Sequence, residues 1–179
     1  MISINIDFNT SDRLAQLFAE STSCQFIGNP DNVRDINWAK KELEDIVKTE
    51  EWHGFKRLGI LKILNDGELI GWSMPRIINP QEYDKLLLPR GVENIYRIGT
   101  IYVTPEYRGK GATKEVMKQY MQMYPRQVWL ADPMNISSQK SATAVGLRKT
   151  GEIYFGENKQ WGHVPFYGYT HSRIIYSTV

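Results

Sequence analysis

Hydrophobic and polar residues follow two different periods along the first third of this chain. The first eight residues alternate isoleucine or phenylalanine with polar residues, which predicts an opening strand. Apolar residues at helical spacing predict a helix over residues 12–20, capped by Thr10 or Ser11, and a second helix over residues 33–50. The second helix is expected to bury a stripe formed by Ile36, Ala39, Leu43, Ile46 and Val47.

A β hairpin is predicted in the next segment. Two apolar runs, residues 58–64 and 68–78, flank Asp66 and Gly67, and Asp-Gly between such runs is a strong hairpin signal. Alternation within the second run predicts one core-facing side, formed by Ile70, Trp72 and Met74.

The pattern breaks between residues 79 and 94. A short helix is possible over residues 81–88, followed by a Pro89-Arg90-Gly91 turn. Two interpretations stay open for this segment: a lid over a substrate cleft, or an excursion packed on the surface.

A strand, a basic loop and a helix follow between residues 98 and 124. The strand, residues 98–103, ends at Pro105, which has no main-chain N–H for a ladder. The helix carries one apolar stripe, which is expected to pack on a sheet. Free N–H groups at a helix start favour a negative charge, and Gly109 and Gly111 remove the Cβ atoms that would hinder close approach. Arg108 and Lys110 add positive charge, so the loop suits a phosphate.

The loop at residues 108–113 resembles the pyrophosphate loop of the GNAT superfamily of acyl-CoA N-acyltransferases. That family has Arg/Gln-x-x-Gly-x-Gly/Ala after a strand that ends near Val-x-Pro-x-x-Arg. The matching residues are Val103, Pro105, Arg108 and Gly111. Thr113 stands where the family has glycine or alanine, which adds bulk and a hydroxyl donor beside the phosphate.

A second resemblance begins at Asn135. Residues 135–147 are similar to the family's Asn-x-x-Ala/Ser-x-x-Leu-Tyr-x-x-x-Gly-Phe, with Asn135, Ser138 and Gly146 matching. Residues 148–152 continue in the style of the ribosomal-protein N-acetyltransferase branch. The departure is Ala142, where many members carry a tyrosine that protonates the leaving thiolate.

The resemblance implies a fold and a co-substrate. The expected fold is α/β (α+β): a GNAT fold with a mixed, mostly antiparallel sheet of six to seven strands, helices on both faces, and residues 1–179 as a single domain. Acetyl-CoA is the implied co-substrate, bound in part by main-chain N–H groups that a bulge or splay of the central strand exposes. The residues implied to bind it are Ile101, Tyr102 and Val103 on that strand, Arg108, Gly109, Lys110, Gly111, Ala112 and Thr113 in the loop, and Asn135 and Ser138 beyond it.

The general base and acid are less defined by the sequence. Asp132 follows a short buried strand, residues 128–131, and could take the proton of the amine directly or through a water; the alternative is a turn residue. Glu93, before the central strand, is a second candidate base. A third possibility is that a chain of solvent molecules carries the proton away. Candidate acids are Ser138, Ser141, Tyr154 and Tyr167.

Arg97 lies in the central strand near the place where members of the family often carry a glutamate base. A guanidinium stays protonated, so it cannot be a base. It could pair with an acidic acceptor group or with a neighbouring carboxylate. By period two, Arg97 is expected to share a face with Ile95, Gly99 and Ile101.

Composition excludes several classes of protein. The chain has 179 residues, a net charge of +2 and one cysteine, Cys24, which excludes an internal disulfide framework and a cysteine zinc site. His53, His163 and His171 lack metal-ligand spacing, so no metal is expected. No apolar run approaches a membrane span and no signal peptide is evident, which makes the cytoplasm the default location.

The leading functional interpretation is an N-acetyltransferase that moves an acetyl group from acetyl-CoA to a primary amine by direct transfer. The acceptor, a small molecule or a protein, is open, as is the choice between monomer and homodimer. Two alternatives remain: a non-catalytic acyl-CoA-binding or interaction module, and a member that modifies a nucleic-acid base. An aromatic segment over residues 161–169 is expected either to wall the substrate cleft or to close the sheet, before a last strand over residues 173–176.

Overall fold

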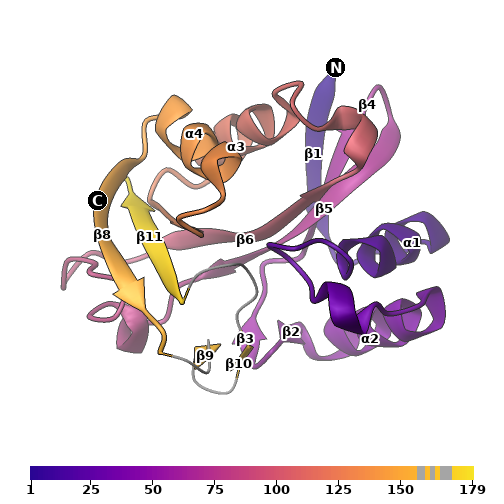
Figure 1. Ribbon diagram of the computed structural model, residues 1–179, viewed down its shortest axis with the longest axis horizontal. Coiled ribbons are helices and arrows are strands. Elements are labelled where there is room, and N and C mark those ends of the chain that lie inside the picture. Colours follow the sequence, from indigo (N-terminus) through magenta and orange to yellow (C-terminus); the bar gives the residue numbers. More distant parts are fainter. Residues whose placement is uncertain (157–159, 162–163, 166–170) are drawn as a thin grey trace.

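A seven-stranded sheet runs through the computed structural model, which describes residues 1–156, 160–161, 164–165 and 171–179 (Figure 1). The strand order is β1-β4-β5-β6-β7-β11-β8, and every neighbouring pair is antiparallel except β6 and β7. The strands are β1 (Ile2–Asp7), β4 (Ile60–Asn65), β5 (Glu68–Ile77), β6 (Tyr96–Val103), β7 (Gln127–Ala131), β8 (Arg148–Tyr154) and β11 (Ser172–Ser177). The predicted mixed, mostly antiparallel sheet is confirmed.

Two pairs of helices cover the two faces of this sheet (Figure 1). Helices α1 (Asp12–Ser21) and α2 (Ile36–Thr49) pack on one face, and α3 (Ala112–Met123) and α4 (Ile136–Ala144) on the other. Short elements complete the chain: β2 (Glu51–Trp52), β3 (Phe55–Lys56), β9 (Gln160–Trp161), β10 (Val164–Pro165), and the 3₁₀ turns η1 (Pro30–Asn32), η2 (Pro80–Glu82) and η3 (Pro105–Tyr107). None of the helices among the described residues is long and apolar enough to cross a membrane.

Side-chain caps decide where the first two helices begin. The Ser11 hydroxyl accepts a hydrogen bond from the Leu14 N–H at 3.1 Å, as expected for the cap of α1. Asp35 caps α2, so this helix begins at Ile36 and not at residue 33. The predicted stripe of α2 is wrong at its ends: Ile36 and Val47 are 39% and 37% exposed, because only the middle of the helix lies on the sheet.

The β4–β5 hairpin is confirmed. Asp66 and Gly67 have φ angles of +49° and +86°, as a two-residue turn of type I′ requires. β4 begins at Ile60, because Gly59, with φ +139°, breaks the extended course before it. Ile70, Trp72 and Met74 of β5 are all buried, but the prediction that they share one side is wrong. Trp72 and Met74 pack with α1 and α2, whereas Ile70 packs with α3, because Ile70 is an extra residue in the pairing of β5 with β4.

The segment between β5 and β6 is packed and does not form a lid. It contains only the 3₁₀ turn η2 in place of the predicted helix over residues 81–88. Tyr83, Leu86 and Leu88 are buried in a hydrophobic cluster with residues of β8 and β11. The lid interpretation is therefore wrong: these apolar side chains hold the segment against the end of the sheet, away from the cleft described below.

A β-bulge interrupts the pairing of β5 with β6. Ser73 is opposite Ile101 and Met74 is opposite Gly99, so Thr100 is an extra residue on β6. The Ser73 hydroxyl donates to the Gly99 carbonyl at this point. An extra residue shifts the alternation by one, and the period-two expectation for Ile101 is wrong. Tyr102, not Ile101, joins the α1–α2 face, while Ile101 packs on the α3–α4 side.

Candidate active site between the splayed strands

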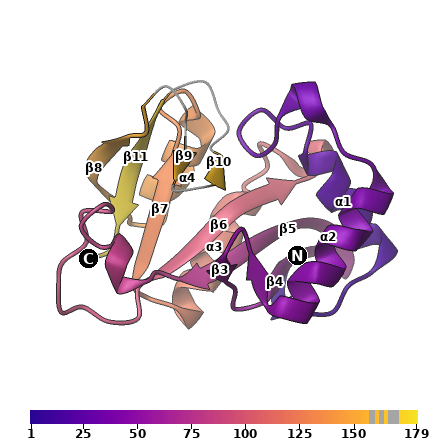
Figure 2. The same ribbon diagram turned by 90° about the horizontal axis from the view of Figure 1, so that it is seen from below.

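The sheet opens between its two parallel strands. β6 and β7 pair only at Tyr96–Gln127 and Arg97–Val128, and beyond these residues the strands diverge, as Figure 2 shows. A cleft of about 1800 Å³ occupies the opening and continues toward the α1–α2 side of the sheet. The carboxyl ends of both strands, where their polar main-chain groups lose their ladder partners, face this cleft.

Main-chain groups of β6 point into the gap. The Thr104 N–H donates to the Ile70 carbonyl of β5 at 2.9 Å, and the Val103 carbonyl instead accepts from Arg108 at 2.8 Å. Because polar groups alternate between the two edges of a strand, the N–H groups of Val103 and Ile101 face the gap. The main chain of Tyr102 is turned toward β5, so of the three residues expected to bind through the main chain, two are placed to do so.

The loop before α3 presents a series of free N–H groups. Within the described part of the chain, the N–H groups of residues 109–114 have no hydrogen-bond acceptor, and no side chain caps the helix. Gly109 and Gly111 have φ angles of +72° and +83°, and nothing lies within 4 Å of where their Cβ atoms would be. Unpaired amides, the positive end of the helix dipole and open space together fit an anion such as a pyrophosphate.

Arg108 fixes this loop to the end of β6. Its Nε–H donates to the Val103 carbonyl, its Nη2 lies 3.4 Å from the Cys24 sulfur, and its guanidinium lies over the Tyr102 ring at 5.4 Å. Lys110, in contrast, does not line the cleft, and its ammonium lies over the Tyr107 ring at 5.8 Å. Arg108 is thus a positioned cation of the cleft.

Helix α4 forms the opposite wall. The Asn135 side chain caps it by accepting from the Ser138 N–H at 3.0 Å, and the Ser138 hydroxyl accepts from the Trp129 indole at 2.9 Å. Ser141 lines the cleft, whereas Ala142 is fully buried in the core. A side chain at position 142 points away from the cleft, so Ser141 occupies the cleft-facing position of this turn.

Asp132, the first candidate base, lies at the end of β7 and lines the cleft. It is only 4% exposed, and its Oδ2 accepts from Arg173 Nη1 at 3.1 Å. Its Oδ1 accepts from the Met134 N–H at 2.8 Å. These donors hold the carboxylate in one orientation.

The other catalytic candidates are distributed unevenly. The structure brings together Asp132, Ser138 and Ser141, but Glu93 is exposed at the opposite end of β6 and does not line the cleft. Tyr154 is 70% exposed on β8 and also lies outside it. Tyr167, His163 and most of the aromatic segment 161–169 lie outside the described residues.

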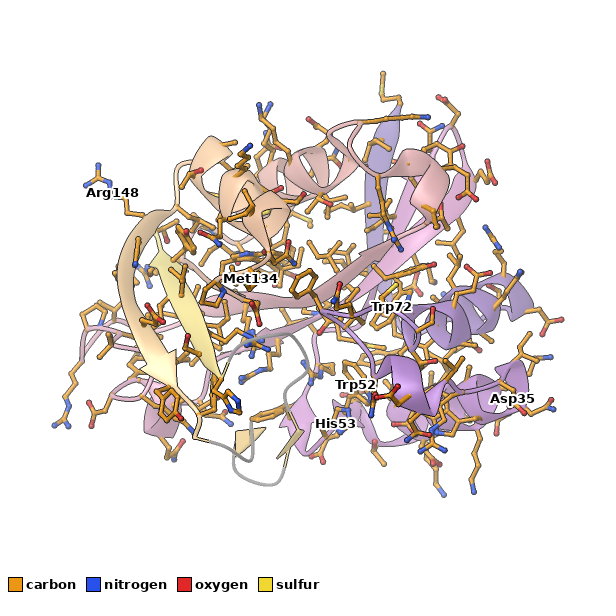
Figure 3. The ribbon with its side chains drawn as sticks, viewed as in Figure 1. Asp35, Trp52, His53, Trp72, Met134 and Arg148 are labelled. Atoms are coloured by element: carbon orange, nitrogen blue, oxygen red, sulfur yellow. The ribbon has the colours of Figure 1, made fainter. Side chains whose placement is uncertain are left out.

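The part of the cleft on the α1–α2 side of the sheet contains residues that sequence reasoning missed. Arg57 and Arg76 line it, together with Trp52 of the β2–β3 ribbon, which Figure 3 shows close to Trp72. The ring centroids of these two tryptophans are 6.0 Å apart. The sequence did contain a signal for these two arginines. Arg57 lies beside an apolar run and Arg76 lies within one, and a buried arginine needs a partner.

Arg76 and Glu82 form a buried, two-pronged ion pair, with N–O distances of 2.6 and 2.7 Å. Burial opposes ionisation of Glu82, but the hydrogen bonds and charge of Arg76 outweigh it and lower the pKa of Glu82 below its ordinary value. We expect Glu82→Gln to reduce the free energy of unfolding at pH 7 by about 3–5 kcal/mol, because Arg76 keeps its charge without a counterion. Urea denaturation measures this difference.

The pH dependence of this pair has a defined sign. Because the folded-state pKa of Glu82 is lowered, its contribution is complete above the ordinary value of 4.5 and is lost as the pH falls through the lowered pKa. The difference between wild type and Glu82→Gln should therefore shrink in acid. Asp84→Asn is the matched control, because the Asp84–Arg90 pair is exposed and its loss should change little. Equal effects of the two variants would contradict the prediction.

The fold and the site define an α/β protein whose central sheet opens into a ligand cleft with an amide-lined, glycine-bearing loop. The model of the acetyltransferase (GNAT) family matches residues 15–146. The chain therefore belongs to the GNAT acetyltransferase family. No curated protein matches the sequence.

Solved structures with the same fold cover nearly the whole chain. RimL, a ribosomal-protein alpha-N-acetyltransferase in complex with coenzyme A, has a TM-score of 0.70 at 15% identity and covers 99% of this chain and 93% of its own. The microcin self-immunity acetyltransferase MccE, in complex with acetyl-CoA and AMP, has a TM-score of 0.64 at 16% identity, covering 99% and 92%. An N-acetyltransferase from Staphylococcus aureus Mu50 has a TM-score of 0.63 at 14% identity, covering 99% and 97%. At these identities the similarity shows the fold alone.

Proposed function

We propose that this protein transfers an acetyl group from acetyl-CoA to a primary amine by direct attack of the amine on the thioester. The observation that carries the proposal is the set of unpaired N–H groups at residues 109–114 beside the opening between β6 and β7. A pyrophosphate on the loop and an amide-bearing arm along the gap would satisfy both sets of main-chain groups. The two solved relatives that contain coenzyme A or acetyl-CoA support this assignment.

Each part of the site has a task in this reaction. The N–H groups of Ile101 and Val103 would meet the polar groups of the pantetheine arm, and one of them would stabilise the negative charge that develops on the carbonyl oxygen. Asp132 would accept the proton of the amine, directly or through a water. The amine nitrogen then bonds to the carbonyl carbon, and the carbon–sulfur bond breaks. Ser141 or Ser138 would relay a proton to the leaving thiolate.

Calorimetry with acetyl-CoA tests the first part of the proposal. We expect micromolar affinity, and absence of binding at millimolar ligand would contradict the proposal. Release of free thiol during incubation with a panel of primary amines tests the second part. Release that depends on both acetyl-CoA and an amine would support transfer.

A non-catalytic acyl-CoA-binding module is the second candidate. The observation that favours it is the engagement of Asp132 by Arg173, together with the position of Glu93 outside the cleft. The first feature occupies the Asp132 carboxylate with another task, and the second leaves Glu93 too distant to act in the cleft. Binding of acetyl-CoA without thiol release over a broad amine panel would favour this candidate over the enzyme.

A further inference from the structure

Four arginines converge in the cleft on the α1–α2 side of the sheet. Arg76 of β5 and Arg97 of β6 are register partners, so their side chains leave the sheet on the same face. Arg57 reaches the same place from the chain after β3, and its Nη1 donates to the Met74 carbonyl of β5 at 3.1 Å. Arg173 of β11 completes the group, and all four side chains line the cleft.

Among the described residues, carboxylates match two of these cations. Arg76 pairs with Glu82, and Arg173 pairs with Asp132. In the described part of the chain, neither of the other two arginines has a carboxylate within ion-pair distance. The described residues on this side of the cleft therefore carry an excess of positive charge.

The two unmatched arginines differ in how they are held. Arg57 is 8% exposed and uses two main-chain carbonyls, of Met74 and Trp52, but its Nε is buried without a partner. Arg97 is half-buried, and its guanidinium makes no hydrogen bond or ion pair with any described residue. Burial and the neighbouring Arg76 lower the pKa of Arg97, although Glu82 opposes this; the guanidinium still keeps its charge at neutral pH.

A charge in this position is unfavourable unless something neutralises it. Like charges directly opposite one another on a sheet repel, and desolvation adds to the penalty. Arginines that serve stability are matched by carboxylates, as Arg76 and Arg173 are here. Arg97 instead lines the cleft with a guanidinium that no described residue pairs, and Arg57 adds a second positive charge beside it. This arrangement suits a carboxylate or phosphate group.

We propose that the acceptor amine carries an anionic group, a carboxylate or a phosphate, that binds to Arg97 and Arg57. The proposal rests on the acetyl-transfer function above and names the class of its acceptor. Arg97 and Ile101 are opposite Arg76 and Ser73 of β5, which are three residues apart, or about 10 Å along an extended strand. The amine and the anionic group would therefore lie at opposite ends of an acceptor several bonds long.

Anion binding can be measured without knowing the acceptor. Thermal unfolding is followed in saturating coenzyme A, which occupies the loop at residues 109–114, while inorganic phosphate or glutarate is added at constant ionic strength. We expect both anions to raise the Tm of the wild type above the value in sodium chloride. Arg97→Met should abolish this increase while its affinity for coenzyme A, measured by calorimetry, stays unchanged.

The same variant has a second expected signature. Without added anions, Arg97→Met should have a Tm at least about 2 °C above wild type, because it removes an unmatched charge beside Arg76. Arg148→Met is the control, since Figure 3 shows Arg148 pointing away from the molecule at β8, and it should change neither the Tm nor the anion effect. A fall in Tm for Arg97→Met, or an unchanged anion effect, would overturn the proposal.

Turnover of different amines distinguishes an acceptor that carries a carboxylate from one that carries a phosphate. The panel contains 5-aminopentanoate, 3-aminopropyl phosphate and the neutral 5-amino-1-pentanol. We expect kcat/KM for one anionic amine to exceed that for the neutral amine at least tenfold, and Arg97→Met to remove the difference through KM. Preference for the neutral amine would overturn the anion site and leave acetyl transfer standing, whereas failure to bind coenzyme A would overturn acetyl transfer alone.

Discussion

Gly111→Glu is expected to weaken coenzyme A binding at least 100-fold while the protein still folds. Gly111 has φ +83° and lies at the N-terminus of α3, where the unpaired N–H groups form the anion site. A glutamate would put a fixed negative charge into that site and occupy the open space over the loop. Calorimetry with coenzyme A measures the loss, and circular dichroism checks the fold.

The control for this variant must reproduce its backbone strain and its charge. Gly91 has φ +85° and open space around its missing Cβ, but it lies in the packed segment before β6, outside the cleft. Gly91→Glu should lose as little stability as Gly111→Glu, about 1 kcal/mol for each variant. Gly91→Glu should also keep full affinity for coenzyme A. If both variants bind coenzyme A equally well, the loop does not hold the pyrophosphate.

Asp132→Asn is expected to lower kcat at least about 100-fold if Asp132 is the general base. The same change leaves Arg173 buried without its carboxylate, which should cost about 3–5 kcal/mol of stability. Affinity for acetyl-CoA should stay close to wild type. The variant alone therefore cannot separate a catalytic role from a structural one.

The double variant Asp132→Asn/Arg173→Met separates the two roles. Removing the guanidinium that has lost the Asp132 carboxylate should restore most of the lost stability. A general base cannot be replaced in this way, so kcat should remain low in the double variant. Recovery of kcat together with stability would mean that the carboxylate only positions Arg173 and the end of β7.

The elements with strong local signals were predictable from the sequence. The alternation of β1, the Asp66-Gly67 turn and the glycine-bearing loop each depend on residues close together in the chain, and the structure has all three. β8 (Arg148–Tyr154) was not predicted as a strand, because its residues are mostly polar and exposed and have no clear alternation.

The features that define the site were less predictable, because they depend on distant residues. The bulge at Thr100 arises from the pairing of β6 with β5, and no local pattern marks it. Arg57, Arg76 and Arg97 come together only once three strands and a ribbon are assembled. Arg97 was recognised as unusual in a strand, but its lack of a carboxylate partner required knowledge of where Glu82 and Asp132 go.

The opening between β6 and β7 also divides the sheet into two parts. Among the described strands, β1, β4, β5 and β6 form one ladder and β7, β11 and β8 form another, joined through two residue pairs at one end. A ligand with amide groups in the gap would supply the missing rungs between them. The acyl donor would then serve as an additional strand, and the sheet would be continuous only while the donor is bound.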